Sequence, residues 1–237
     1  MLPRDESSTG SIMGDRHAAR VAGALFIAAT VPFSISVGVL APVLESPDFL
    51  AAVAGHPARV SAGILLELTN HVAVVGIAVV LYPILRRDSE RLALGYVVAR
   101  SIEGALFAVG TTNLISLKAL SDRVGATNPS GAEALSSTLL AAHDWNQVTL
   151  PFVAFALGTL LLNYHLFRRK LVPRWISGWG FIAGASILLA RVLLLGGAPL
   201  TSPIVTAMDA PIFAQEMVFA VWLIVRGFAE PTEREAT

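Results

Sequence analysis

Five ionisable side chains occur inside stretches of the chain that are otherwise apolar enough to cross a membrane. They are three carboxylates and two guanidiniums: Glu67, Glu103, Glu216, Arg100 and Arg191. A charged side chain near the centre of a bilayer costs several kcal/mol unless it faces another charge, a cavity or a ligand. The sequence therefore predicts an integral membrane protein with a charged interior.

The chemistry open to this set is proton or ion binding, because carboxylates outnumber guanidiniums by one. A carboxylate in a low-dielectric interior without a cation either holds a proton or attracts a cation. His71 follows Glu67 by four residues and could supply that cation. Alternatively, the surplus carboxylate is itself a proton- or ion-binding group. Pairs of Arg100 with Glu103 and of Arg191 with Glu216 could also serve only to fix helix register and packing.

Other polar residues are expected to join these charges. Asn70 and His71 share one helix face with Glu67 because their offsets are three and four. Alternating helix directions place Arg100 in the inner half of its helix and most of the other polar groups between the midplane and the outer surface. The predicted ligand-binding or structural cluster contains Glu67, Asn70, His71, Arg100, Glu103, Arg191, Gln215 and Glu216, with His143, Asp144, Asn146 and Gln147 at the outer mouth of the fourth helix.

A metal centre is the other chemistry that these residue types allow. Glu67, His71 and His143 carry nitrogen and oxygen ligands suited to zinc. However, no His-Glu-x-x-His motif occurs, and the absence of cysteine excludes thiolate sites and disulfides. We expect no metal and no cofactor, and assign no catalytic residue. The alternative is an intramembrane metal-dependent hydrolase-type enzyme, with Glu67 as acid/base and the two histidines holding a metal or water.

The elements that must position these residues are long helices. Of the 237 residues, 54% are hydrophobic and 14% are charged, whereas a soluble domain would carry roughly 25% charged residues. Six stretches are long enough to cross about 30 Å of hydrocarbon at about 1.5 Å per residue. We therefore predict an all-α, polytopic bundle of six transmembrane helices: 21–41, 60–85, 92–117, 145–167, 175–195 and 208–228.

The distribution of Lys and Arg predicts the orientation of this bundle. Twelve of the seventeen lie in the N-terminal region, the two turns at 86–91 and 168–174, and the C-terminal region. The opposite loops hold Arg59, Lys118 and Arg123. Because basic residues concentrate in cytoplasmic loops, we expect both termini to be cytoplasmic and the protein to lie in the cell (inner) membrane.

The segments outside the six helices are short. Residues 1–16 are polar and predict a disordered tail, 17–229 form one transmembrane domain, and 230–237 form a polar C-terminal tail. The outer connections at 45–59 and 121–143 each predict a short surface helix. Before the second of these, the sequence Asn128-Pro129-Ser130-Gly131 indicates a turn, with Ser130 as a candidate helix cap. Gly180 and Gly184 form a small-xxx-small pair typical of close helix packing.

Several segments together carry a family resemblance. They are Arg20-Val21-Ala22-Gly23, Leu81-Tyr82 with Leu85-Arg86, Arg100 with Glu103, Tyr164-His165-Leu166-Phe167-Arg168 with Pro173 and Gly178, and Gln215-Glu216 with Trp222-Leu223 and Gly227-Phe228. Over residues 16–228 their order and spacing resemble bacterial and archaeal membrane proteins grouped as domain of unknown function 4386. The resemblance implies a polytopic helical fold and supplies no reaction, ligand or catalytic residue.

These observations favour a six-helix membrane protein without catalytic activity. It would use its charged cluster for binding or transport of a small ligand or ion, or for helix assembly. The expected partner is the lipid bilayer, not nucleic acid, because the net charge is zero. A homo-oligomer is also expected because 25.0 kDa is small for a stand-alone transporter. A regulatory, partner-binding membrane subunit remains a further alternative.

Overall fold

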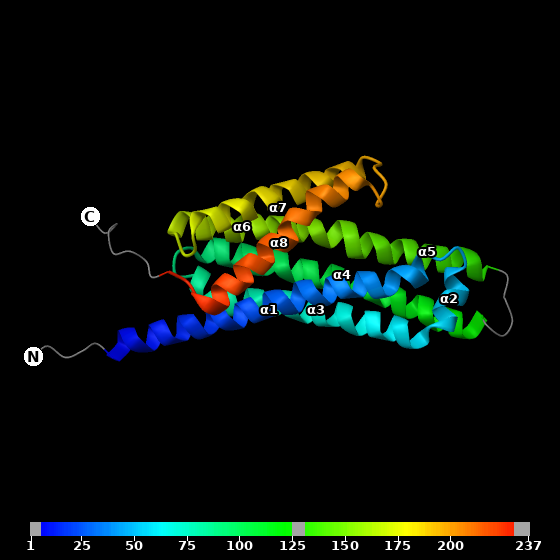
Figure 1. Ribbon diagram of the computed structural model, residues 1–237, viewed down its shortest axis with the longest axis horizontal. Coiled ribbons are helices and arrows are strands. Elements are labelled where there is room, and N and C mark those ends of the chain that lie inside the picture. The colour runs from blue at the N-terminus through cyan, green and yellow to red at the C-terminus, as the bar shows by residue number, and fades with distance from the viewer. Residues whose placement is uncertain (1–5, 125–130, 230–237) are drawn as a thin grey trace, which may run out of the picture.

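A computed structural model describes residues 6–124 and 131–229 of the chain, with side chains from residue 15 onward. All regular structure in these residues is helical, as predicted (Figure 1). The elements are α1 (Glu6–Leu44), α2 (Phe49–Gly55), α3 (Pro57–Leu85), α4 (Glu90–Val124), α5 (Ala132–Asp144), the π-helical turn η1 (Trp145–Thr149), α6 (Leu150–Arg169), α7 (Arg174–Leu195) and α8 (Pro203–Val225).

Six helical segments are long and apolar enough to cross a membrane, which makes the chain a multi-pass membrane protein. They are Asp15–Leu44, Pro57–Leu85, Glu90–Val124, Ala132–Arg169, Arg174–Leu195 and Pro203–Val225. Each contains most or all of one predicted span, so the number and order of the spans are confirmed.

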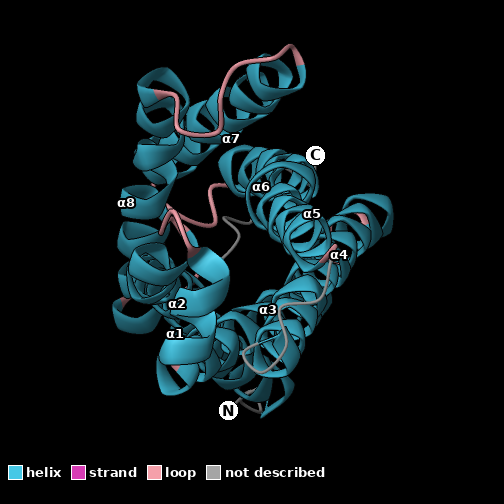
Figure 2. Ribbon diagram, turned by 90° about the vertical axis from the view of Figure 1, so that its right-hand side faces the viewer, coloured by secondary structure: helices cyan, strands magenta, loops and turns pink. Residues whose placement is uncertain are grey.

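The six spans form a closed ring rather than two layers. Each packs against two neighbours in the order α1, α3, α4, α6, α7, α8 and back to α1, and the end-on view in Figure 2 shows this arrangement. The N-terminal end of α1 and the C-terminal end of α8 lie at the same end of the bundle, here called the termini end (Figure 1). The opposite end carries α2 and α5 and is called the α5 end. Side chains from different spans therefore meet in the middle of the ring.

Three segments differ from the sequence-based predictions. Residues 6–16, expected within a disordered tail, are helical in α1, since a helix nucleated by the apolar span propagates more easily than a new one begins. Residues 1–5, Ser130 and the tail from 230 lie outside the described residues. Of the two surface helices, α2 is separate, whereas α5 continues through η1 into α6 as one long helix.

The π-helical turn joins α5 to α6, and Pro151 explains its position. Proline has no backbone N–H, and its ring clashes with the carbonyl of the residue four before it. A wider turn at this point relieves that conflict, because the Leu150 N–H bonds to the Trp145 carbonyl, five residues earlier. Such a turn also leaves backbone groups free for partners on other helices. Here the Val148 carbonyl accepts a hydrogen bond from Arg191 on α7.

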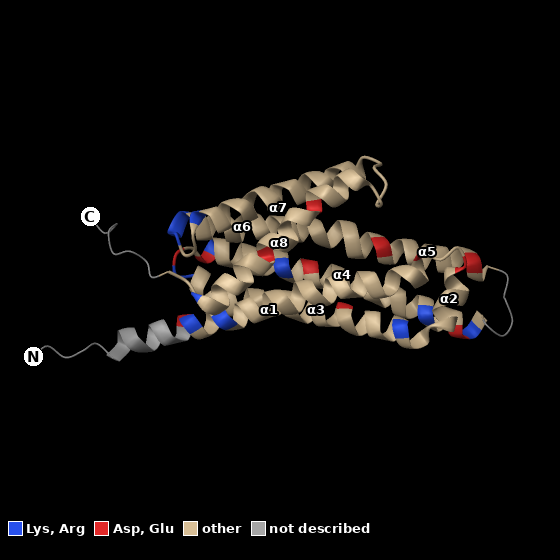
Figure 3. Cartoon of the chain, in the orientation of Figure 1, with Lys and Arg blue, Asp and Glu red and all other residues tan. Residues whose placement is uncertain are grey.

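Apolar packing closes both ends of the ring around its middle. Toward the termini end, a large core includes Phe26, Ile77, Tyr96, Leu166 and Phe219. Toward the α5 end, side chains of α2 and α5 cover a second apolar cluster that includes Leu40, Val43 and Leu114. Figure 3 shows Lys and Arg gathered mainly at the two ends of the bundle, with few in between. The charged groups in the middle are therefore enclosed along the bundle axis.

Candidate functional site

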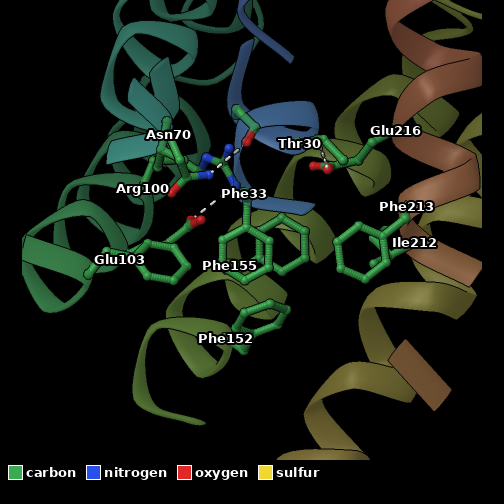
Figure 4. Close-up of a pocket in the computed structure, with 13 residues that line it drawn as sticks. Thr30, Phe33, Asn70, Arg100, Glu103, Phe152, Phe155, Ile212, Phe213 and Glu216 are labelled. Atoms are coloured by element: carbon green, nitrogen blue, oxygen red, sulfur yellow. Dashed lines mark hydrogen bonds and ion pairs between the residues drawn. The ribbon is translucent and has the colours of Figure 1, made fainter. Parts of the chain in front are cut away.

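A small cavity lies in the middle of the ring, between α1, α3, α4, α6 and α8 (Figure 4). Its volume is about 30 Å³. One water needs at least about 10–15 Å³ on this measure, so the cavity has room for about two waters and for no larger molecule. Its lining residues are Ala29, Thr30, Phe33, Asn70, Val74, Arg100, Glu103, Phe107, Phe152, Phe155, Ile212, Phe213 and Glu216.

One ion pair on α4 lies in this cavity. Arg100 Nη1 is 3.0 Å from Glu103 Oε2, and both side chains are only 3% exposed. The pairing confirms the sequence-based expectation for these two residues. The Arg100 guanidinium also lies over the Phe155 ring, 5.3 Å from its centroid, which adds a cation–π contact.

A second carboxylate, Glu216 on α8, faces the same cavity without a cation. Thr30 on α1 donates a hydrogen bond of 2.8 Å to its Oε2. Among the described residues, no Lys, Arg or His lies within ion-pair distance of Glu216. In Figure 4, Arg100, Glu103 and Asn70 lie on one side of the cavity and Thr30 and Glu216 on the other. Two carboxylates therefore share the cavity with one guanidinium.

Two polar atoms of the cavity residues lack hydrogen-bond partners within the described part of the chain. They are Asn70 Oδ1 and Arg100 Nε, on side chains that are at least 95% buried. A buried polar group without a partner costs about 1–3 kcal/mol. Water in the cavity could accept from one of these atoms and donate to the other.

A separate polar cluster lies nearer the α5 end and centres on Glu67 of α3. The Glu67 carboxylate accepts a hydrogen bond of 2.5 Å from Thr111 Oγ1, and its other oxygen lies 3.1 Å from His143 Nε2. The other ring nitrogen of His143 is 3.2 Å from Asp144 Oδ1. Gln147 donates to Thr111 Oγ1 at 3.2 Å. We call Glu67, Thr111, His143 and Gln147 the Glu67 cluster.

An aromatic layer, made of Phe33, Phe107, Phe152 and Phe213, separates the Glu67 cluster from the cavity charges. The Phe33 ring lies 5.8 Å, 6.0 Å and 6.5 Å from those of Phe107, Phe152 and Phe213. Along α4 the order is Glu103, Phe107, Thr111. The eight residues from Glu103 to Thr111 span about 12 Å. The polar groups therefore occupy two levels, and the prediction of one shared level is wrong.

A third polar group forms around Arg191 on α7. Arg191 is fully buried and donates hydrogen bonds to Asp209 of α8 and to the Val148 carbonyl. Its guanidinium lies 4.8 Å from the centroid of the Phe152 ring. The predicted pair of Arg191 with Glu216 is therefore wrong. The reason is position: α8 begins at Pro203, so Asp209 lies on the first turns, near Arg191, while Glu216 lies two turns further on, at the cavity.

The remaining predicted residues lie apart from the cavity. His71 is 7% exposed, stacks on Phe107 at 5.4 Å between centroids, and has no hydrogen-bond partner at either nitrogen within the described structure. It is therefore not the hydrogen-bonded partner of Glu67; His143 is. Gln215 donates to the Ile176 carbonyl of α7. Glu67 and His143 meet, but no group of three His, Asp or Glu side chains among the described residues could hold a metal ion.

Some residues of the site carry weak sequence signals. Thr30 and Thr111 are uncharged. Because threonine is common in apolar helices, its presence there does not mark either residue as part of a site. Asp209 lies two residues before Pro211 near the start of its helix, where an acidic residue is ordinary and does not indicate an interior ion pair. The spacing of Arg100, Glu103, Phe107 and Thr111 by three or four residues does mark one face of α4. That spacing could have predicted that Phe107 and Thr111 face the same interior as the charges.

Comparison with known proteins supports the family resemblance. The model of a family described as Domain of unknown function (DUF4386) matches residues 21–227, from α1 to just beyond the end of α8. No curated protein and no solved structure matches the chain.

Proposed function

The chain belongs to the family of domain of unknown function 4386, and we propose that it is a membrane protein that reversibly binds a proton in its central cavity. The observation that carries the proposal is the pair of carboxylates, Glu103 and Glu216, around a cavity with one guanidinium. Arg100 balances one carboxylate and leaves the other uncompensated. A carboxylate in that position is stabilised by taking up a proton or a small cation.

The size of the cavity decides which ligands fit. A volume of about 30 Å³ holds about two waters and excludes an organic substrate. A small cation such as Na⁺ would need several oxygen ligands, and the fixed positive charge of Arg100 opposes it. A proton, shared with ordered water, adds almost no volume and neutralises Glu216. The proton is therefore the favoured ligand.

The proposal extends to the orientation and location of the protein. Twelve of seventeen Lys and Arg occur in the terminal regions and the two turns of the termini end. We place that end in the cytoplasm and the protein in the cell membrane, in accord with the positive-inside rule. The α5 end then faces outward.

The test is a pH titration followed by infrared absorption of the protonated carboxyl groups, in lipid nanodiscs. We expect a carboxyl band from the cavity to appear as the pH falls, because protonation converts a carboxylate into a neutral carboxyl group. Glu216→Gln should remove the band or shift its midpoint. Glu133→Gln, an exposed carboxylate on α5, is the matched control and should leave that band unchanged.

Two outcomes would contradict the proposal. One is a wild-type protein without a titrating band that depends on Glu103 or Glu216. The other is a midpoint that moves with Na⁺ or K⁺ concentration at constant ionic strength, because the ligand would then be a metal cation.

A further inference from the structure

An imidazole bridges a surface carboxylate and a buried carboxylate at the α5 end. His143 Nδ1 lies 3.2 Å from Asp144 Oδ1, and His143 Nε2 lies 3.1 Å from Glu67 Oε1. The Asp144 side chain is 42% exposed, whereas those of His143 and Glu67 are 7% and 4% exposed. Each nitrogen of the ring therefore contacts a different environment.

This arrangement suits proton transfer because imidazole can accept a proton at one nitrogen while it releases another from the opposite nitrogen. After such a step, a flip of the imidazole ring restores the starting tautomer, and no covalent bond other than N–H and O–H changes. The partly exposed Asp144 carboxylate is the group through which a proton from the aqueous phase at the α5 end would enter. Glu67 is the group that receives it inside the bundle.

The groups around this bridge do not neutralise it. Thr111 of α4, which donates to Glu67, and Gln147 of η1, which donates to Thr111, are uncharged. His71 is the titratable group on the same face of α3, one turn from Glu67. Among the described residues, no Lys or Arg forms an ion pair with Glu67, Asp144 or His143. The net charge of Asp144, His143 and Glu67 therefore changes when they take up a proton, because no neighbouring Lys or Arg among the described residues compensates it.

Beyond Glu67, the interior continues toward the cavity through polar atoms without partners. His71, one turn along α3, is 93% buried and has two unpartnered ring nitrogens within the described structure. It lies against Phe107, within the aromatic layer that separates the two levels. Asn70, the residue before it, lines the cavity and has an unpartnered oxygen. Within the described structure, His71 is thus an ionisable group that lies in the aromatic layer, between Glu67 and the cavity.

We propose that Asp144, His143, Glu67 and His71 form a proton path from the surface of the α5 end to the central cavity, with His143 as the exchanging group. This proposal rests on the proposed function, because the cavity carboxylates are its terminus. It adds the route and the side from which the proton arrives. At the termini end, His165 Nε2 lies 3.1 Å from Asp88 Oδ2, but among the described residues no buried carboxylate lies within ion-pair distance of its ring.

The experiment measures how fast the cavity carboxyl band responds to a rapid pH jump in nanodiscs. His143→Gln keeps an amide donor for Glu67 but cannot relay a proton. It should slow the response by about 100-fold or more, the least that a well-placed proton-transfer group usually contributes. The final amplitude of the band should not change. His56→Gln, at an exposed histidine of the same end, is the control and should respond at the wild-type rate.

Asp144→Asn provides a second variant at a partly exposed position and should also slow the response. If the band keeps its amplitude and either folded variant responds at the wild-type rate, the path is wrong while the proposed function stands. If wild-type protein shows no titrating cavity band, the proposed function fails, and the path, which would then have no terminus, fails with it.

Discussion

At the scale of residues, the choice of ion-pair partners determines which carboxylate is free. Arg191 takes Asp209 and the Val148 carbonyl, and Arg100 takes Glu103. Among the described residues, the Thr30 hydroxyl is then the one hydrogen-bond partner of Glu216. Two of the three carboxylates counted from the sequence are thereby left without a guanidinium: Glu67, which contacts His143, and Glu216, which faces the cavity. Glu216 is the group on which the proposed proton binding depends most directly.

The partnership of Arg191 can be tested by double-mutant analysis. Arg191→Met should lower the free energy of unfolding by about 3–5 kcal/mol, because it leaves Asp209 and a buried carbonyl unpaired. Adding Asp209→Asn should recover about 1 kcal/mol or more, measured by reversible unfolding in detergent with circular dichroism. Arg191→Met and Glu216→Gln should instead be additive within about 0.5 kcal/mol. Strong coupling in that second pair would contradict the assignment.

At the scale of elements, small residues determine how closely the helices approach. A Cβ atom added at Gly180 of α7 would lie 2.3 Å from Asn163 Oδ1 on α6. Asn163 cannot simply move aside, because it is 4% exposed and donates to the Thr159 carbonyl. At Gly184, the added atom would lie 3.1 Å from Thr159 Cγ2. The small-xxx-small pair therefore packs α7 against α6 of the same chain.

Gly180→Ala should destabilise the protein by about 1–3 kcal/mol, the usual cost of an overpacked contact. Gly178→Ala lies in the same helix and is the matched control, because its nearest neighbour would be Phe167 Cε2 at 3.9 Å. The control should be neutral or stabilising by up to about 1 kcal/mol, since alanine favours helix over glycine. Thermal unfolding of both variants in one detergent distinguishes them. Equal melting temperatures would show that α6 and α7 are not in close contact.

At the scale of the whole molecule, the ring encloses polar groups that two packed layers would expose. The spans close on themselves, from α8 back to α1, so α3, α4 and α8 can present charges to a common interior. At the termini end, Arg87 donates hydrogen bonds of 2.5 and 2.8 Å to Asp15 and links α1 to the turn between α3 and α4. That hydrogen bonding raises the pKa of Arg87 above its already high ordinary value. A cation with a raised pKa contributes its full stabilisation below its unfolded-state pKa and loses it only as the pH rises past its folded-state pKa, so this contact stabilises the fold throughout the neutral range.

The orientation of the molecule can be tested directly because the chain has no cysteine. Ser137→Cys, exposed on α5, should react with a membrane-impermeant maleimide in intact cells. Ala229→Cys, exposed at the termini end, should react only after the membrane is permeabilised. The unsubstituted chain is the control and should not be labelled. The reverse pattern would place the termini outside and would move the proton path to the cytoplasmic side.

The sequence by itself determined the class of the protein, its spans and the presence of charges within them. Hydrophobic length is a local property of each stretch, so all six helices could be found from windows of the chain, and Arg100 with Glu103 could be paired because both lie on one helix. Only the tertiary structure decided that His143 rather than His71 contacts Glu67, that Asp209 rather than Glu216 contacts Arg191, and that phenylalanines separate two polar levels. These contacts join residues of different helices. Which residues meet depends on the axial offset and rotation of each helix, and these are set by packing around the ring, by the π-helical turn before Pro151 and by where each helix begins. No spacing along one helix contains that information.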